Sequence, residues 1–82
     1  MQSPPDPLTL IAVSWHDCYS EDAWTSIGDL LLRTTYTIDT VGWYIGQTEG
    51  HWVIASGLDT KGNAGSTWFI PEVLIKTWRA LT

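Results

Sequence analysis

The residues with the most reactive side chains stand together after a stretch expected to form the first strand: His16, Asp17 and Cys18. A thiolate, a base and an orienting carboxylate are the groups that nucleophilic catalysis uses. Catalytic groups normally converge from separate elements, however, and no motif for stabilising an oxyanion accompanies these three residues. We therefore predict no catalytic residue, and we expect Asp17 to accept backbone hydrogen bonds in the turn after the strand.

Metal binding is not predicted either, because the set of possible ligands is too small. His51 is the second histidine of the chain, and one cysteine with two histidines cannot complete a structural zinc site. No phosphate-binding loop motif occurs, and the glycines between residues 57 and 65 do not have the spacing of a dinucleotide fingerprint. We therefore expect neither a metal nor a cofactor.

Charge restricts the partners further. The net charge is −5, and residues 1–40 carry six acidic residues against one basic residue. Four basic residues in 82 are too few for a surface that follows phosphates, so duplex nucleic acid is not an expected partner. A nucleotide-like ligand would need these cations and the backbone N–H groups of residues 62–66. The candidates for such phosphate binding are Arg33, Lys61, Lys76 and Arg79.

Length and composition predict one small domain. Hydrophobic residues make up 44% of the 82 residues, which is enough for a core. Residues 1–7, with three prolines, are expected to form an extended and frayed lead-in, and residues 8–82 the domain. No apolar stretch approaches the roughly 20 residues that a membrane span needs. A lone Cys18 cannot form an internal disulfide, so we expect a protein of the reducing cytoplasm.

Aromatic residues are the strongest indication of binding. Six tryptophans are more than a core of this size is expected to hide, and tryptophan is enriched at interfaces. The connection after the first strand brings rings together with a hydrogen-bond acceptor, which suits a protein partner or a ringed small ligand. The candidate binding residues in this connection are Trp15, Asp17, Tyr19 and Trp24.

A hairpin in residues 41–56 is expected to organise the rest of the chain. Two alternating apolar segments flank a polar turn at residues 47–50, which is typical of a β-hairpin. A loop of two or four residues places Trp43 and Trp52 on the same face, because a slip of one residue moves every side chain to the other face. We therefore predict an even loop. The predicted core face carries Val41, Trp43, Ile45, Trp52, Ile54 and Ser56.

The opposite face of the hairpin is predicted to be exposed. Its members would be Gly42, Tyr44, Gly46, His51 and Val53. Tyr44 and Val53 lie there between glycines that allow a close approach, so both are further candidates for binding a partner or a second copy of the chain.

The remaining elements are expected to be mostly short strands. Residues 8–15 alternate as a first strand, with Thr9, Ile11, Val13 and Trp15 on one side and Leu8, Leu10, Ala12 and Ser14 on the other. A short helix follows, with Ser20 or Ser26 as its start. Residues 34–39 lead into the hairpin, residues 58–66 form a turn, and Pro71 ends a strand that begins at residue 67. The apolar stripe of the helix is Trp24, Ile27 and Leu31.

The segment H-W-V-I-A-S-G-L-D-T-K-G-N-A-G-S-T-W-F-I-P-E-V-L-I, residues 51–75, resembles the second half of an SH3 barrel. A Trp-led strand, a turn, a short strand ending in proline, a 3₁₀ turn and a last strand follow one another in that family. The resemblance favours a 3₁₀ turn at residues 71–74 and a strand at 75–81, where helical spacing is the alternative. The fold class predicted is therefore mainly β: a small five-stranded, SH3-like or Sm-like, partly open barrel with one short helix between its first two strands.

The family's groove for proline-rich peptides is matched only in part. Trp52 and Pro71 stand at two of its positions, but Leu74 stands where the family has a tyrosine. Binding of polyproline peptides is therefore not predicted.

The whole chain also resembles a family of small bacteriophage proteins with the pattern V-x-W-x-D, then V-G-W before a hairpin, then I-P. This resemblance implies a phage origin and no defined activity. The function expected is a non-enzymatic binding protein that occupies a host protein in the cytoplasm of the infected cell, with a defence component as one possible target. The alternative is an oligomer that sequesters a nucleotide-like immune signalling molecule. The matching residues are Val13-Ser14-Trp15-His16-Asp17, Trp24, Val41-Gly42-Trp43 and Ile70-Pro71.

Overall fold

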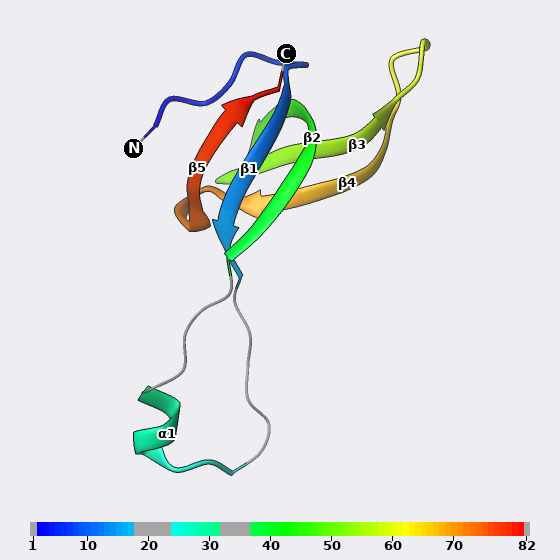
Figure 1. Cartoon of the computed structure of the whole chain (residues 1–82). Coiled ribbons are helices and arrows are strands. Elements are labelled where there is room, and N and C mark those ends of the chain that lie inside the picture. The colour runs from blue at the N-terminus through cyan, green and yellow to red at the C-terminus, as the bar shows by residue number, and fades with distance from the viewer. Residues whose placement is uncertain (1, 18–23, 32–36, 82) are drawn as a thin grey trace.

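The computed structural model describes residues 2–17, 24–31 and 37–81. Five antiparallel strands form one curved sheet in the order β4-β3-β2-β1-β5, and within the described residues the sheet does not close. β4 and β5 are therefore its two edges (Figure 1). This is the predicted mainly β, partly open barrel with one short helix. The strands are β1 (Leu10–His16), β2 (Thr37–Thr48), β3 (His51–Leu58), β4 (Ala64–Pro71) and β5 (Ile75–Ala80).

The hairpin between β2 and β3 has the predicted even loop. Glu49 and Gly50 connect the strands, and both have positive φ angles, 48° and 75°. This is the conformation that a two-residue type I′ turn requires, and glycine adopts it without steric cost. The Nδ1 atom of His51 lies 2.8 Å from the carbonyl oxygen of Glu49, which adds a contact across the turn.

The two faces of the hairpin differ from the prediction because β2 contains a bulge. Gly46 pairs with Val53 but Tyr44 pairs with Ile54, so Ile45 is left without a partner. A bulge of one residue reverses the alternation of side chains on one strand. The predicted assignment of Trp43 to the core and Tyr44 to the outer face is therefore wrong.

Gly42 shows how closely the strands approach on the core side of β2. A Cβ atom at this position would lie 2.6 Å from the carbonyl oxygen of Ala55 and 2.7 Å from Cγ2 of Ile54. The space that we expected to admit another molecule is thus filled by β3 of the same chain. Val41 is exposed on the other face of β2, and Ser56 of β3 is exposed as well, although both were predicted to be buried.

The core is small and aromatic. Trp52 is 1% exposed and meets Tyr44 edge to face, with ring centroids 5.2 Å apart. The indole N–H of Trp15 donates a 3.0 Å hydrogen bond to Oγ1 of Thr40, which is itself buried. The buried hydrophobic cluster consists of Ile11, Val13, Trp15, Tyr44, Trp52, Ile54 and Ile70, with Ile38, Ile75 and Trp78 packed against it.

The C-terminal end of the chain forms as the SH3 resemblance implied. Pro71 is the last residue of β4, a 3₁₀ turn follows at Glu72–Leu74, and β5 begins at Ile75. β5 pairs with β1, and Trp78 lies opposite Val13. The backbone of β5 thus forms its hydrogen bonds with a strand about sixty residues or more away in the sequence. The alternative of a C-terminal helix is therefore excluded.

The lead-in, which we expected to be extended and frayed, is held on the barrel by hydrogen bonds of Gln2 and Ser3. Oε1 of the Gln2 carboxamide accepts from the backbone N–H of Trp78 at 3.1 Å, and its Nε2 donates to the Trp78 carbonyl at 3.0 Å. The indole N–H of Trp78 donates to the carbonyl of Ser3 at 2.8 Å, and Pro5 is buried. The Gln2 carboxamide thus pairs with the backbone N–H and carbonyl of Trp78, as the backbone of an additional strand would.

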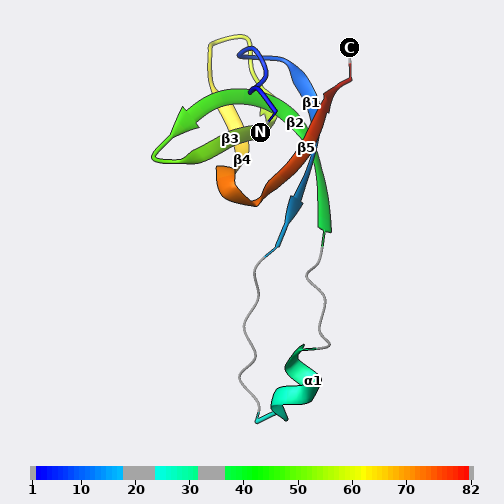
Figure 2. The ribbon, with the colours of Figure 1, turned by 90° about the vertical axis from the view of Figure 1, so that its left-hand side faces the viewer.

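Helix α1 (Ile27–Leu31) lies beyond the end of β1 and the start of β2, away from the sheet (Figures 1 and 2). The molecule measures 52 × 24 × 22 Å, and the outlying helix accounts for the long dimension. The backbone N–H of Asp29 donates to Oγ of Ser26 at 3.2 Å, which confirms Ser26 as the start of the helix. The other predicted start, Ser20, lies outside the described residues. No described helix is long and apolar enough to span a bilayer.

Candidate functional site

The four candidates after the first strand do not form one surface. Trp15 is 8% exposed and belongs to the core, where Trp68 of β4 covers it with a ring-centroid distance of 6.5 Å. Asp17 is half-buried just past the end of β1, and Tyr19 lies outside the described residues. Trp24 alone remains available as an exposed aromatic anchor.

The two candidates on the hairpin are also separated. Tyr44 is buried against Trp52, and Val53 is half-buried on the opposite face. Burial raises the pKa of the Tyr44 hydroxyl, and the Glu72 carboxylate raises it further, while a hydrogen bond with Gln47 partly offsets both effects. Tyr44 is therefore a core residue and not a binding residue.

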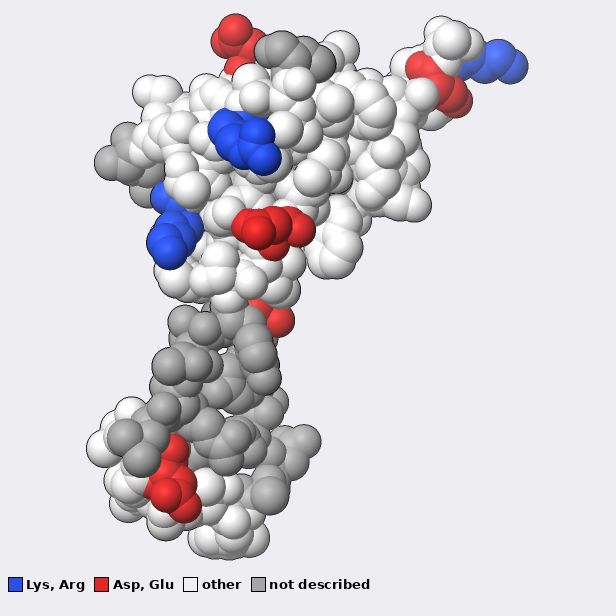
Figure 3. All heavy atoms as spheres, in the orientation of Figure 1, with Lys and Arg blue, Asp and Glu red and all other residues white. Residues whose placement is uncertain are grey.

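The cations proposed to hold phosphates are spread over the molecule. Lys61 stands in the turn between β3 and β4, whereas Lys76 and Arg79 lie on β5 at the other edge of the sheet (Figure 3). Arg33 lies outside the described residues. One copy of the chain thus does not gather the three described cations, and the hypothesis of an oligomer that sequesters a nucleotide stays a prediction.

In the turn between β3 and β4, the carboxylate of Asp59 accepts hydrogen bonds from other groups of the same turn. Oδ1 of Asp59 accepts from the backbone N–H groups of Lys61 at 2.8 Å and Asn63 at 2.9 Å, and Oδ2 accepts from the Asn63 side chain. The hydrogen bonds from Asn63 and from Lys61 hold the pKa of the Asp59 carboxyl below its usual value. Of the N–H groups in residues 62–66 that we expected to help a phosphate, that of Asn63 is therefore already used.

Three of the four most exposed large apolar side chains of the described residues lie at and beside α1; the fourth is Val73 of the 3₁₀ turn. Trp24 is fully exposed, Ile27 is 77% exposed and Leu31 is 80% exposed. We call these three residues the α1 patch. Ile27 and Leu31 are four residues apart on α1, as neighbouring anchors of an amphipathic helix are, and Trp24 precedes the first turn of the helix. The sequence predicted these residues as the apolar stripe of the helix, and the structure leaves them without a cover from the described part of the chain.

Acidic groups accompany the α1 patch. Asp29 is exposed within α1, and Asp17 lies just past the end of β1, where the connection to α1 begins. Glu21 and Asp22 belong to the same connection in the sequence, and the three described cations all lie on the barrel. The end of the molecule that carries the apolar patch is therefore also its acidic end.

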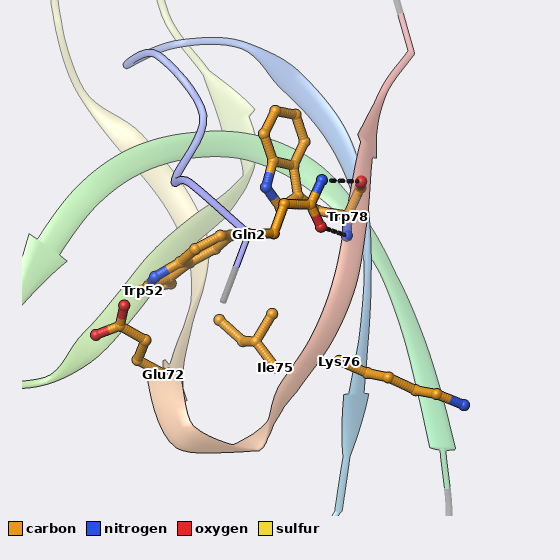
Figure 4. A pocket seen from close by; sticks show the side chains of 6 residues that line it. All are labelled: Gln2, Trp52, Glu72, Ile75, Lys76 and Trp78. Atoms are coloured by element: carbon orange, nitrogen blue, oxygen red, sulfur yellow. Dashed lines mark hydrogen bonds between the residues drawn. The ribbon is translucent and has the colours of Figure 1, made fainter.

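A small pocket lies at the open end of the barrel, between the lead-in, the 3₁₀ turn and β5 (Figure 4). Its volume is about 60 Å³, which is room for a few water-sized groups. The indole N–H of Trp52 is buried here without a described hydrogen-bond partner, and Figure 4 shows this nitrogen on the side of the Glu72 carboxylate. The residues lining the pocket are Gln2, Trp52, Glu72, Ile75, Lys76 and Trp78.

The pocket provides one donor and one carboxylate, and no pair of groups suited to acid–base chemistry. The side chain of Lys76 points away from the interior in Figure 4. Elsewhere in the described part of the chain, no three histidine, cysteine, aspartate or glutamate side chains gather as metal ligands would.

Comparison with protein-family models, with curated proteins and with solved structures finds no match for this chain. The site must therefore be argued from the residues. The sequence marked Trp24 as a candidate binding residue and placed Ile27 and Leu31 only in the apolar stripe of the helix. An apolar helical stripe is normally buried against its own domain, so the pattern alone does not mark these two residues for binding.

Proposed function

We propose that this protein is a non-enzymatic binding protein that inserts the α1 patch into an apolar groove of a partner protein. The observation that carries the proposal is the exposure of Trp24, Ile27 and Leu31, each at 77% or more, at one end of the molecule. Large contiguous apolar exposure of this kind marks interaction sites in soluble proteins. Trp is also the residue type most enriched among interface anchors.

The chemistry of the partner follows from the surroundings of the patch. Asp29 is exposed within α1, and the acidic residues of the first half of the chain outnumber its one cation. A groove with an apolar floor and a basic rim would complement this surface, and the charges would speed association. The resemblance to small phage proteins suggests that such a partner is a host protein, with a defence component as one possible target.

The barrel has a different part in this proposal. α1 has only five residues, and an isolated helix of that length is not stable in water. The barrel holds both ends of the connection through the paired strands β1 and β2, with His16 opposite Thr37. It thereby limits the conformations that the patch can adopt before binding, which reduces the entropy lost on association.

The test is a measured affinity for a partner captured from host lysate and then purified. Trp24→Ala should weaken binding by at least about tenfold, which is the loss expected for a central aromatic anchor. The matched control is Val73→Ala, because Val73 is 85% exposed on the 3₁₀ turn of the barrel, away from the patch. This variant should bind like the unaltered protein.

Varying the salt concentration separates the contribution of the charges from that of the apolar side chains. Raising the ionic strength should lower the association rate and leave the dissociation rate nearly unchanged, because rim charges act mainly on the approach of the partners. Equal affinities of Trp24→Ala and the unaltered protein for the purified partner would show that the α1 patch is not the binding surface.

A further inference from the structure

The outer face of β5, β1 and β2 carries a second feature that the α1 patch does not explain. Two rows of side chains cross these strands on this face. In one row Ala12 lies between Arg79 and Val41, and in the other Ser14 lies between Thr77 and Asp39. The small residues Ala12 and Ser14 stand on the middle strand, so the face is hollowed along β1.

The hollow is large and partly apolar. Its volume is about 300 Å³, and its lining includes all six residues of the two rows. Val41 is 57% exposed at one wall, and the half-buried Trp43 continues the apolar surface along β2. An exposed valine beside an indole on a strand face is a surface that a second apolar surface would cover favourably.

The two charges on this face are fixed on opposite sides of the hollow. Oγ of Ser14 donates a hydrogen bond to the Asp39 carboxylate, which holds that carboxylate on the β2 side. Arg79 is exposed on the β5 side and forms no ion pair with any described residue. Figure 3 shows few charged side chains on this side of the barrel, where β5 carries Lys76 as well as Arg79.

We propose that this face is a twofold interface between two copies of the chain. A surface with one anion and one cation on opposite sides of its centre is complementary to itself after a rotation of 180°, as an isologous dimer requires. Asp39 of each copy then meets Arg79 of the other, and the two Val41 side chains pack over Ala12. The hollow over the small residues of one copy is filled by side chains of the second.

The interface leaves the α1 patch free. α1 lies beyond the strand ends, whereas the two rows lie on the sheet itself (Figure 2). A dimer would therefore present two α1 patches, and a multivalent partner would bind with an effective concentration set by their separation. The dimer does not depend on the proposed function, because it can be measured without any partner.

The test is the dimer dissociation constant of the full chain, measured by sedimentation equilibrium. Arg79→Glu and Asp39→Arg should each raise this constant by at least about tenfold, because each places like charges opposite one another. The double variant Asp39→Arg/Arg79→Glu should return it to within about threefold of the unaltered protein, since the pairs are re-formed with exchanged partners. Lys61→Glu is the control, because it makes the same charge change in the distant β3–β4 turn.

A second variant tests whether a rise in the dimer dissociation constant comes from loss of the interface or from unfolding. Val41→Lys changes an exposed position, so the fold should persist by near-ultraviolet circular dichroism while dimerisation is lost. A monomer at protein concentrations near 1 mM would overturn the proposal. Dimers that are unaffected by Arg79→Glu and Val41→Lys, or a folded double variant that does not recover dimerisation, would overturn it as well.

Discussion

The barrel and the α1 connection use the same residue type in opposite ways. Trp52 of β3 is 1% exposed and forms the centre of the core with Tyr44, whereas Trp24 before α1 is fully exposed. In the barrel, strands from distant parts of the chain surround the Trp52 indole. At α1, a five-residue helix has no second element of the described chain to pack against.

This difference separates stability from recognition within 82 residues. Burial of large rings supplies most of the favourable free energy that a domain of this size can gain, and such a domain has little to spare. Apolar side chains that remain outside the core contribute nothing to that free energy. They are useful only if something else covers them, which is why we assign the α1 patch to a partner.

The largest expected effect is that of Trp52→Ala. Removing a fully buried indole should lower the free energy of unfolding by about 3–5 kcal/mol, which approaches the whole stability of a small domain. Trp24→Ala, the matched change at α1, should alter it by less than about 0.5 kcal/mol. Urea unfolding followed by far-ultraviolet circular dichroism measures both, and similar losses for the two variants would remove the contrast between the regions.

Gly42→Ala tests how tightly the barrel is packed. The new Cβ would approach backbone and side-chain atoms of β3 within 2.7 Å, so we expect a loss of about 1–3 kcal/mol in the free energy of unfolding. Gly57→Ala is the control on β3, because a Cβ there meets nothing within 4 Å. A Gly42→Ala variant as stable as Gly57→Ala would mean that β2 and β3 are further apart at this point.

Alkaline pH should destabilise the barrel through Tyr44. The pKa of this hydroxyl is raised in the folded state, first by burial and then by Glu72, so folding favours the protonated form. The corresponding stability is fully present below the unfolded pKa of about 10 and is lost as pH rises through the higher folded pKa.

The measurement for this prediction is the urea midpoint from pH 8 to about pH 11, compared with that of Tyr44→Phe. The variant lacks the ionisable group, so its stability should fall less over the same range. Parallel curves for the two proteins would assign the alkaline loss to other groups.

The smallest expected effect is that of Gly28→Ala in α1. Alanine favours a helix over glycine by about 1 kcal/mol, and a Cβ at this position meets nothing within 4 Å. The helical signal should therefore rise, while the free energy of unfolding of the barrel changes by less than about 0.5 kcal/mol. A gain in barrel stability equal to the local gain would show that α1 and the sheet unfold together.

Local patterns in the sequence determined most of the elements. Alternation predicted β1 and placed Ile11, Val13 and Trp15 on one side of it, the side that the structure buries, and the polar centre of the hairpin predicted a loop of even length. Pro71 marked the end of β4, and Ser26 with Asp29 marked the start of α1. These features follow from backbone restrictions and neighbouring hydrogen bonds, which depend on a few consecutive residues.

The tertiary structure alone decided which rings are buried. The bulge at Ile45 exchanges the roles of Trp43 and Tyr44, and no local pattern announces it, because its position depends on how β2 bends around the core. The exposure of the α1 stripe was likewise beyond the sequence. An apolar helical stripe has the same pattern whether it faces its own sheet or a partner, and only the position of α1 beyond the strand ends distinguishes the two.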